Sequence, residues 1–179
     1  MPTDCIPFKD TNYFSSLICD YLDNKDFLKP FYNRFPNVGN FKSQIEEKRK
    51  SVQGQSRTAL VSSLKNQYQH INISSQTLQN IEALKDENTF TITTGHQLNL
   101  FTGPLYFFYK IIATINLCKE LKETYPELHF VPIYWMATED HDFEEINFFN
   151  LNEKKISWNR EASGAVGELD LKGLEQVSI

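Results

Sequence analysis

The chain has 179 residues, of which 40% are hydrophobic and 23% charged, so it is long enough to form one domain of ordinary size around a hydrophobic core. Lys and Arg total 18 against 23 Asp and Glu, and the resulting net charge of -5 argues against general binding of nucleic acid. With 7 Gly and 7 Pro, the chain is neither low-complexity nor collagen-like.

The three cysteines, Cys5, Cys19 and Cys118, lie far apart and form neither a CxxC pair nor a metal-binding spacing. A sparse, odd number of cysteines is typical of reduced thiols, so we expect a cytoplasmic protein. The first residues lack a basic stretch followed by an apolar run, so no secretory signal is predicted. The most apolar stretch, residues 98–117, is interrupted by polar and helix-breaking residues, which favours a buried helix over a membrane span.

The first half of the chain is predicted to be helical. Apolar residues recur at helical spacing in three stretches: 11–23, 41–70 and 76–85. Gly54 weakens the middle of the second stretch, and Ser74 or Ser75 is the predicted N-cap of the third. We therefore interpret residues 1–86 as a mainly helical N-terminal segment.

The pattern then changes to a strand, a helix and a second strand. Residues 89–94 are β-branched and aromatic, which predicts a strand that ends at Gly95. Residues 104–123 predict a helix with Pro104 at its first position, and its first half is apolar nearly all round, so we expect deep burial. Residues 130–137 are apolar on both faces, as in the interior of a parallel sheet. The arrangement predicts a βαβ unit.

The rest of the chain predicts short strands separated by turns, at residues 146–151, 155–158 and 167–171. We assign residues 87–179 to the first part of a doubly wound α/β domain. Two parallel strands cannot bury both of their faces, so we expect either further strands beyond Ile179 or a partner that supplies them. The final residues look like the start of a helix, and we expect the chain to be truncated or partial.

The first candidate site, residues 93–104, follows the first strand, where open parallel sheets bind their ligands. Gly95 would allow close backbone approach, His96 could serve in acid/base chemistry, and amides at the following helix N-terminus could hold an anion. The segment is neither a GxGxxG fingerprint nor a P-loop. An alternative interpretation is that His96 is a loop residue bonded to backbone.

The second candidate site, residues 135–147, places five acids and one His within seven positions, directly after the second strand. Asp140, His141 and Asp142 could ligate a metal, orient a substrate amine or form a His–carboxylate base. A structural interpretation is equally open. Acids favour the first turn of a helix, and Thr138 or Asp140 would then be its cap while the remaining acids face solvent.

Both motifs resemble the bacillithiol biosynthesis cysteine-adding enzyme family, the cysteine ligases. The resemblance lies in residues 94–106 (TGHQLNLFTGPLY) with Tyr109-Lys110, and in residues 135–147 (WMATEDHDFEEIN). The opening of the chain, with Pro7-Phe8 and Lys29-Pro30-Phe31-Tyr32, is also similar to that family's start. The resemblance covers essentially the whole chain, which would correspond to the first third of such a protein.

The resemblance implies a fold in which a helical lead-in precedes the first half of a Rossmann-like, nucleotidylyltransferase-like parallel sheet domain. Related cores place a His-containing signature after the first strand, where His96 falls. The implied activity is addition of L-cysteine to the glucosamine amine of glucosaminyl-malate by amide formation, the last step in making bacillithiol. The cofactor stays open, with ATP or another nucleotide as the candidate. A long coiled coil and a homodimer are implied for the full-length protein.

We predict catalytic roles for four residues: His141, Asp140, Asp142 and His96. Substrate binding is predicted for seven more: Thr94, Gly95, Gln97, Asn99, Thr102, Gly103 and Glu139. The expected partners are cysteine and glucosaminyl-malate, without metal, nucleic acid or membrane, and the 179 residues alone are expected to be inactive. Two alternatives remain open: a metal-dependent hydrolase that uses Asp140, His141 and Asp142, and a non-catalytic partial chain that needs a partner.

Overall fold

The computed structural model describes residues 4–52 and 54–177, and the chain divides into two compact units, Met1–Val52 and Gln53–Ile179. The sequence analysis placed the domain boundary elsewhere, between residues 86 and 87, and that boundary stays a prediction.

Short helices make up the first unit. α1 (Ser16–Leu22) begins later than the helix predicted near residues 11–23, because the side chain of Ser15 caps its first turn. α2 (Phe41–Ser51) ends where Val52 adopts extended geometry, with φ -105° and ψ 115°. The remaining regular segments are 3-10 helices: η1 (Phe8–Thr11), η2 (Asp26–Phe31) and η3 (Val38–Asn40).

Two helices open the second unit, α3 (Gly54–Tyr68) and α4 (Ser75–Ala83). The stretch 41–70, predicted as one helical region with a weak middle, therefore forms two helices. Ser74 is the N-cap of α4, as predicted, and its Oγ accepts a hydrogen bond from the Thr77 amide at 3.1 Å.

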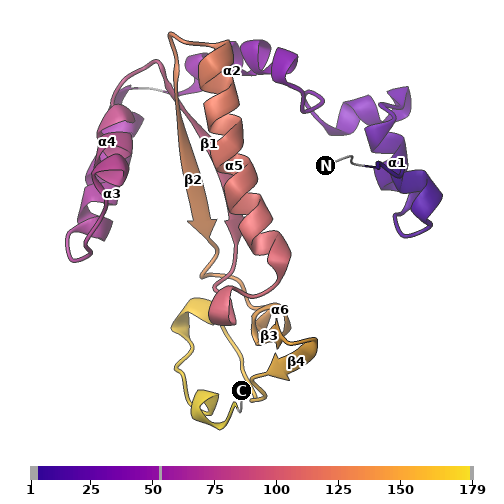
Figure 1. Ribbon diagram of the computed structural model, residues 1–179. Helices are drawn as coiled ribbons and strands as arrows, with labels where there is room; N and C mark the ends of the chain where they lie inside the picture. The colour runs from indigo at the N-terminus through magenta and orange to yellow at the C-terminus, as the bar shows by residue number, and fades with distance from the viewer. Residues whose placement is uncertain (1–3, 53, 178–179) are drawn as a thin grey trace. The chain divides into compact units, whose positions relative to one another are not determined.

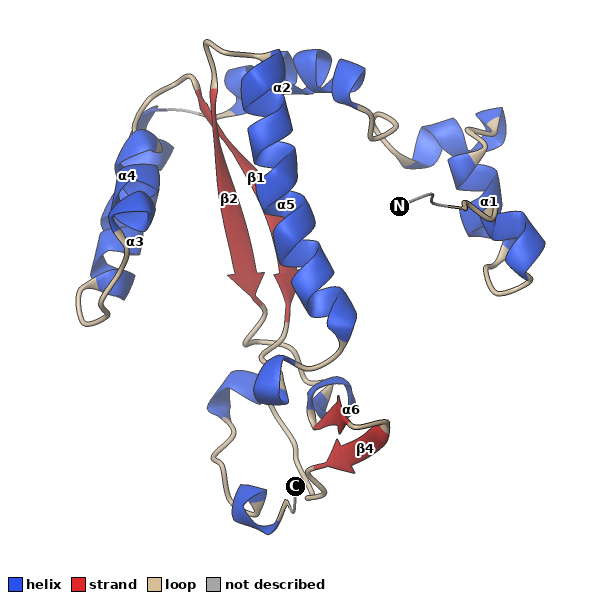
Figure 2. Ribbon diagram, viewed as in Figure 1, coloured by secondary structure: helices blue, strands red, loops and turns tan. Residues whose placement is uncertain are grey.

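The sheet of the second unit has two parallel strands, β1 (Thr89–His96) and β2 (His129–Met136), connected by α5 (Leu105–Thr124). The register begins with Thr89 opposite His129. Helices α3 and α4 lie on one side of the strands and α5 on the other (Figure 1). Figure 2 shows the same layering with the strands in red. The predicted Rossmann-like arrangement of strand, helix and parallel strand is confirmed.

Alternate residues of β2 face the two helical layers. Ile133 packs against a buried cluster on the side of α3 and α4, whereas the ring of Tyr134 lies 5.5 Å from that of Phe107 in α5. The buried cluster consists of Val61, Ile81, Leu84 and Val131. Each such aliphatic side chain contributes about 1.5–3 kcal/mol by its removal from water. The sheet is therefore held between two helical layers.

The outer face of α5 is exposed, so the prediction of deep burial is wrong. Its buried residues are Thr114, Cys118 and Leu121, which lie on the face toward the sheet. Five apolar residues have exposed fractions between 37% and 68%: Leu105, Phe108, Tyr109, Ile112 and Ile115. A two-stranded sheet is narrow and covers only one face of α5, which leaves the apolar residues on the opposite face exposed. Among the described residues, no helix has the length and apolarity needed to cross a membrane.

After β2 the chain forms α6 (Phe143–Ile146) and an antiparallel hairpin of β3 (Phe148–Leu151) and β4 (Lys154–Ser157). The third short strand predicted in this region, 167–171, is wrong, because the backbone there turns through η5 (Val166–Glu168) to bond the loop after β2. Two further 3-10 helices are η4 (Leu100–Thr102) and η6 (Leu174–Gln176).

Candidate functional site at the carboxyl edge of the sheet

Both sequence motifs lie at the carboxyl edge of the parallel strands. The register pairs His96, the last residue of β1, with Met136, the last residue of β2. The Tyr134 hydroxyl donates to the His96 carbonyl oxygen at 2.8 Å, and the Ala137 amide donates to the same oxygen at 3.1 Å. The two motifs are therefore neighbours at the edge where such sheets bind ligands.

His96 is buried, and both of its ring nitrogens have partners within the chain. Its Nε2 lies 2.6 Å from the Tyr106 hydroxyl oxygen, and its Nδ1 lies 3.0 Å from Asn99 Nδ2. The Phe107 ring packs edge-on against the imidazole, with 6.2 Å between ring centroids. His96 is thus fixed in place, and its Nε2 contacts a side chain from the first turn of α5.

Gln97 connects the first motif to the second. It is buried, with an exposed fraction of 5%, and its Nε2 donates to Glu145 Oε2 at 2.8 Å. A buried amide beside a carboxylate is satisfied by this charge-assisted hydrogen bond. Glu145, one of the acids for which a solvated position was an open interpretation, is therefore held against the loop that follows β1.

The carboxylates of Asp140 and Asp142 both bind backbone. Asp140 Oδ1 accepts from the Asp142 amide at 3.0 Å, and Asp142 Oδ1 accepts from the Glu145 amide at 3.3 Å. Asp142 is thus the N-cap of α6, rather than Thr138 or Asp140. These contacts fix the turn that carries the cluster of acids.

His141 and Glu139 face different surroundings. His141 is exposed, and no hydrogen bond joins its imidazole to the residues that the structure describes. Glu139 Oε1 accepts from Trp135 Nε1 at 3.2 Å. Within residues 4–52 and 54–177, no three His, Cys, Asp or Glu side chains converge in a way that could hold a metal ion.

A hollow of about 320 Å³ opens beside these residues. It is lined by Pro104, Tyr106, Asp142, Glu144, Glu145 and Phe148. Partial burial, with a smaller contribution from the nearby Glu145 carboxylate, raises the pKa of the Tyr106 phenol above its ordinary value. The hydroxyl therefore keeps its proton at neutral pH. Two predicted site residues, His96 and Gln97, hold wall residues of this hollow, and Asp142 lines it directly.

The loop between β1 and α5 contains three successive residues with positive φ: Phe101 at 45°, Thr102 at 77° and Gly103 at 56°. Thr102 is exposed. A Cβ on Gly103 would lie 2.6 Å from Asn99 Oδ1, so the Asn99 side chain fills the space beside this glycine. The predicted roles of Asn99, Thr102 and Gly103 in substrate binding stay predictions.

Gly95 lies inside β1, so the prediction that the strand ends at this glycine is wrong. The strand continues through His96. A Cβ on Gly95 would lie 3.0 Å from the Trp135 carbonyl oxygen and 3.2 Å from its Cβ, closer than side chains normally pack. Glycine is therefore favoured by the close approach of β2. Thr94 is half-buried in the same strand, opposite Tyr134.

A C-terminal loop, residues 158–173, holds the turn that carries the acids. The Val166 amide donates to the Asp140 carbonyl oxygen at 2.7 Å, and the Gly167 amide donates to that of Thr138 at 2.9 Å. A Cβ on Gly167 would lie 2.6 Å from the Thr138 Cβ, so the two segments touch directly.

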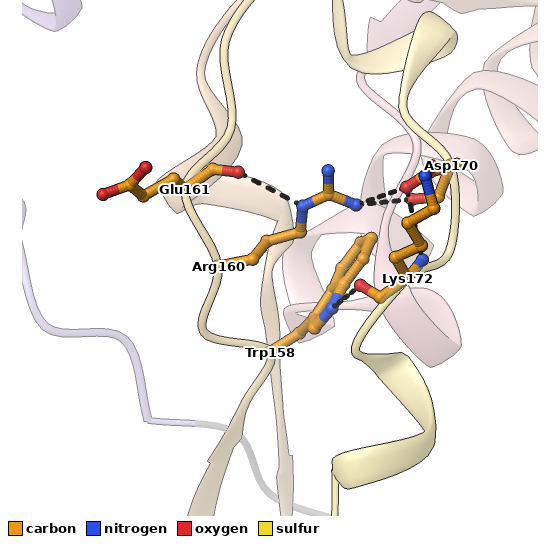
Figure 3. Close-up of polar contacts among 5 residues, drawn as sticks. All are labelled: Trp158, Arg160, Glu161, Asp170 and Lys172. Carbon is orange, nitrogen blue, oxygen red and sulfur yellow. Dashed lines mark hydrogen bonds and ion pairs between the residues drawn. The ribbon is translucent and has the colours of Figure 1, made fainter.

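A cluster around Trp158 closes this loop (Figure 3). The indole is buried, with 3% exposed, and donates to the Lys172 carbonyl oxygen at 3.1 Å. The Arg160 guanidinium lies 5.3 Å from the indole and donates to Asp170 Oδ1 at 2.7 Å. Hydrogen bonds from Arg160 and then Lys172 lower the pKa of the Asp170 carboxyl to about 2.

The sequence analysis gave no site role to Tyr106, Tyr134 or Lys110. Tyr106 contacts His96, Tyr134 bonds its carbonyl, and the Lys110 ammonium donates to the Gly95 carbonyl oxygen at 3.2 Å. A signal for Tyr106 was present. It follows Pro104 by two residues, and the N-terminus of a crossover helix lies at the carboxyl edge of its sheet.

A βαβ unit with helices on both faces and a polar site at its carboxyl edge defines a Rossmann-like domain. Comparison with known families agrees, since the family described as "Bacillithiol biosynthesis BshC, N-terminal Rossmann-like domain" matches residues 1–178. The chain belongs to this family, which confirms the resemblance seen in the two motifs.

Curated relatives from several bacteria are similar to the chain, and each is named "Putative cysteine ligase BshC". The protein from Flavobacterium johnsoniae is 62% identical over 98% of this chain and 33% of its own length. That from Cytophaga hutchinsonii is 43% identical over 96% of the chain and 33% of its own length. That from Bacillus thuringiensis is 33% identical over 87% of the chain and 30% of its own length. The chain thus spans about a third of the length of these relatives.

Proposed function

We propose that this chain supplies the Rossmann-like domain of a ligase that joins L-cysteine to the glucosamine amine of glucosaminyl-malate by an amide bond. The family match over residues 1–178 and the names of the relatives support a cysteine ligase of bacillithiol biosynthesis. The observation that carries the proposal is that both family-like motifs contribute to one hollow, through the hydrogen bond between Gln97 and Glu145.

The chemistry of the hollow suits an amine substrate. Asp142, Glu144 and Glu145 line it, and their carboxylates would attract an ammonium group. Amide formation also requires the ammonium of the second substrate, glucosaminyl-malate, to lose a proton before its nitrogen attacks the cysteine carboxyl carbon. We assign that proton removal to His141, which follows Asp140 and precedes Asp142 in the chain.

The cysteine carboxyl also has to be activated, and ATP or another nucleotide is the candidate for that step. The proposed partners are cysteine and glucosaminyl-malate, and the proposed assembly of the full-length protein is a homodimer. Cytoplasmic localisation belongs to the same proposal.

The proposal is tested with a chimera in which this chain replaces the matching third of the Flavobacterium johnsoniae relative, to which it is 62% identical. The purified chimera is incubated with cysteine and glucosaminyl-malate, with and without ATP, and the products are analysed by mass spectrometry. We expect the cysteinyl amide of glucosaminyl-malate.

The intact Flavobacterium relative serves as the positive control, and the isolated 179-residue chain is assayed beside it. We expect no amide from the isolated chain. A chimera that melts like the relative but forms no amide under conditions in which the relative does would contradict the proposed function.

A further inference from the structure

The hydrogen bonds around Asn99 fix which nitrogen of His96 carries the proton. Asn99 Nδ2 lies 2.8 Å from the Gln97 carbonyl oxygen and 3.0 Å from His96 Nδ1. A carbonyl oxygen only accepts, so the amide nitrogen must face it, and the same NH₂ group donates to Nδ1. His96 Nδ1 is therefore an acceptor. The Gln97 carbonyl oxygen, 3.3 Å away, is also an acceptor, so these two atoms do not share a hydrogen bond.

The proton of the neutral imidazole then lies on Nε2, which donates to the Tyr106 hydroxyl oxygen at 2.6 Å. A hydroxyl that accepts a hydrogen bond becomes a stronger donor of its own proton. Among the residues that the structure describes, no acceptor for that hydroxyl proton is found. The donor is thus available to a bound molecule.

Tyr106 lies on the wall of the hollow with an exposed fraction of 44%, so a ligand there could reach its hydroxyl. Three carboxylates share the same wall: Asp142, Glu144 and Glu145. A molecule that satisfies both kinds of group carries an ammonium and, close to it, an oxygen acceptor. A free amino acid has this pairing of groups.

We propose that Tyr106 is a substrate-contacting residue that donates its hydroxyl hydrogen bond to the carboxyl oxygen of the bound amino acid, with His96 and Asn99 as positioning residues. This inference rests on the proposed function. It assigns to Tyr106 the contact with the carboxyl group whose carbon is attacked in the proposed reaction. The carboxyl is first activated by ATP as an acyl phosphate or acyl adenylate. As the glucosamine nitrogen bonds to its carbon, the C=O electron pair moves to the oxygen, and His141 takes the proton from the nitrogen. The pair returns when phosphate or AMP departs with its own bonding pair. Tyr106 stabilises the transient negative charge and keeps its proton throughout.

The first test reads the position of the His96 proton in the full-length chimera. Imidazole ¹⁵N spectra are recorded on the chimera labelled at its histidines, and His96→Gln identifies the signal. We expect the Nε2–H form. Asn99→Asp places a carboxylate, which only accepts, beside Nδ1 and should move the proton there. An Nδ1–H form in the unsubstituted chimera would overturn the positioning roles of Asn99 and His96.

The second test is kinetic and uses the chimera. Tyr106→Phe should lower kcat by about 100- to 1,000-fold, the usual cost of losing one hydrogen-bond donor to a developing negative charge, with a smaller change in the KM for cysteine. Tyr109→Phe is the matched control, because Tyr109 lies on the exposed face of α5, and it should leave both constants unchanged.

The outcomes of the two tests separate this inference from the proposed function. If Tyr106→Phe retains the kcat of the unsubstituted chimera, the role of Tyr106 is overturned while the ligase assignment stands. If the unsubstituted chimera forms no amide, the proposed function fails. The Nε2–H form of His96 would then still support the hydrogen-bond network on which the inference depends.

Discussion

Gly95 shows how one missing side chain positions an entire strand. Its hydrogen atom faces the Trp135 backbone, and a Cβ there would lie 3.0 Å from the Trp135 carbonyl oxygen. Backbone cannot move aside as a flexible side chain can, so any larger residue at this position would push β2 away from β1 at the edge that carries the site.

We therefore expect Gly95→Val to lower the free energy of unfolding by about 1–3 kcal/mol, with Gly95→Ala between it and the unsubstituted chain. Urea titration followed by circular dichroism measures the change. Gly54→Ala is the control, since a Cβ added there meets no atom within 4 Å outside its own helix and chain neighbours, so the only expected change is a small stabilisation from better helix propensity. Unchanged stability of Gly95→Val would show that the close approach does not constrain the strand.

His141 is exposed, so its substitution can lower the catalytic rate without changing the stability of the fold. In the chimera, His141→Ala should lower the rate of cysteine addition by about 100-fold or more, the usual scale for a lost general base. The melting temperature should not change, because the imidazole makes no hydrogen bond to a described residue. His70→Ala, at another exposed histidine, should leave the rate unchanged. Full activity of His141→Ala would remove it from the mechanism.

Roles of individual residues were harder to predict than the motifs that contain them. The type and position of His96 indicated chemistry, but its contact with Tyr106 depends on a loop in which Phe101 and Thr102 adopt positive φ. Residue type does not predict such a conformation for Phe or Thr. The same holds for Gln97 and Glu145, which are far apart in the chain and meet because β1 and β2 are in register.

At the scale of elements, the C-terminal loop fixes the acidic turn through backbone hydrogen bonds. The loop is itself held closed by the ion pairs of one carboxylate, that of Asp170. Asp170 accepts from the Arg160 guanidinium at 2.7 Å and pairs with the Lys172 ammonium at 2.9 Å. These partners stabilise the ionised form, so the pKa falls from the ordinary 3.8 to about 2. The stabilisation is present above the ordinary value and is lost as the pH falls from 3.8 through 2.

We expect the loop to open in that acid range and release Trp158, which is otherwise 3% exposed. In a Trp135→Phe background, Trp158 is the sole tryptophan, and its emission should shift to longer wavelength as the pH falls from 4 toward 2. Asp170→Asn should shift the emission at neutral pH and remove this step, because Asn does not ionise. Glu161→Gln is the control, because Glu161 contacts Arg160 through its carbonyl oxygen. An identical acid transition in Asp170→Asn would contradict this account.

Helices and strands followed from local patterns where those patterns were long. The β-branched run at β1 and the helical spacing of α5 predicted both elements within two residues of their observed ends. The short alternation at residues 167–171 did not predict its structure, because a strand requires a partner ladder, and this segment makes isolated backbone bonds to the turn after β2. Periodicity also identified the apolar faces of α5 without indicating what would cover them.

The whole molecule exposes apolar surface on more than one element. Trp135 and Met136, at the end of β2, have exposed fractions of 59% and 50%, and the outer face of α5 adds a helical row that includes Tyr109 and Ile112. Large exposed apolar side chains gathered on one element often mark association surfaces. The sequence predicted that two parallel strands cannot bury both of their faces, but it also predicted deep burial of α5, so the exposed row on that helix was not expected.

We therefore predict that the 179 residues alone self-associate or stay partly open, and bind a dye that reports exposed apolar surface. Light scattering and dye fluorescence measure both properties. Ile112→Glu should reduce the two signals together, because it places a charge in the middle of the exposed row on α5. Ile71→Glu is the matched control, since Ile71 is 60% exposed outside that row and should leave association nearly unchanged. A monomer that binds no dye and melts cooperatively would show that α5 and β2 find cover within the chain itself, and the argument from exposed apolar surface would then be wrong.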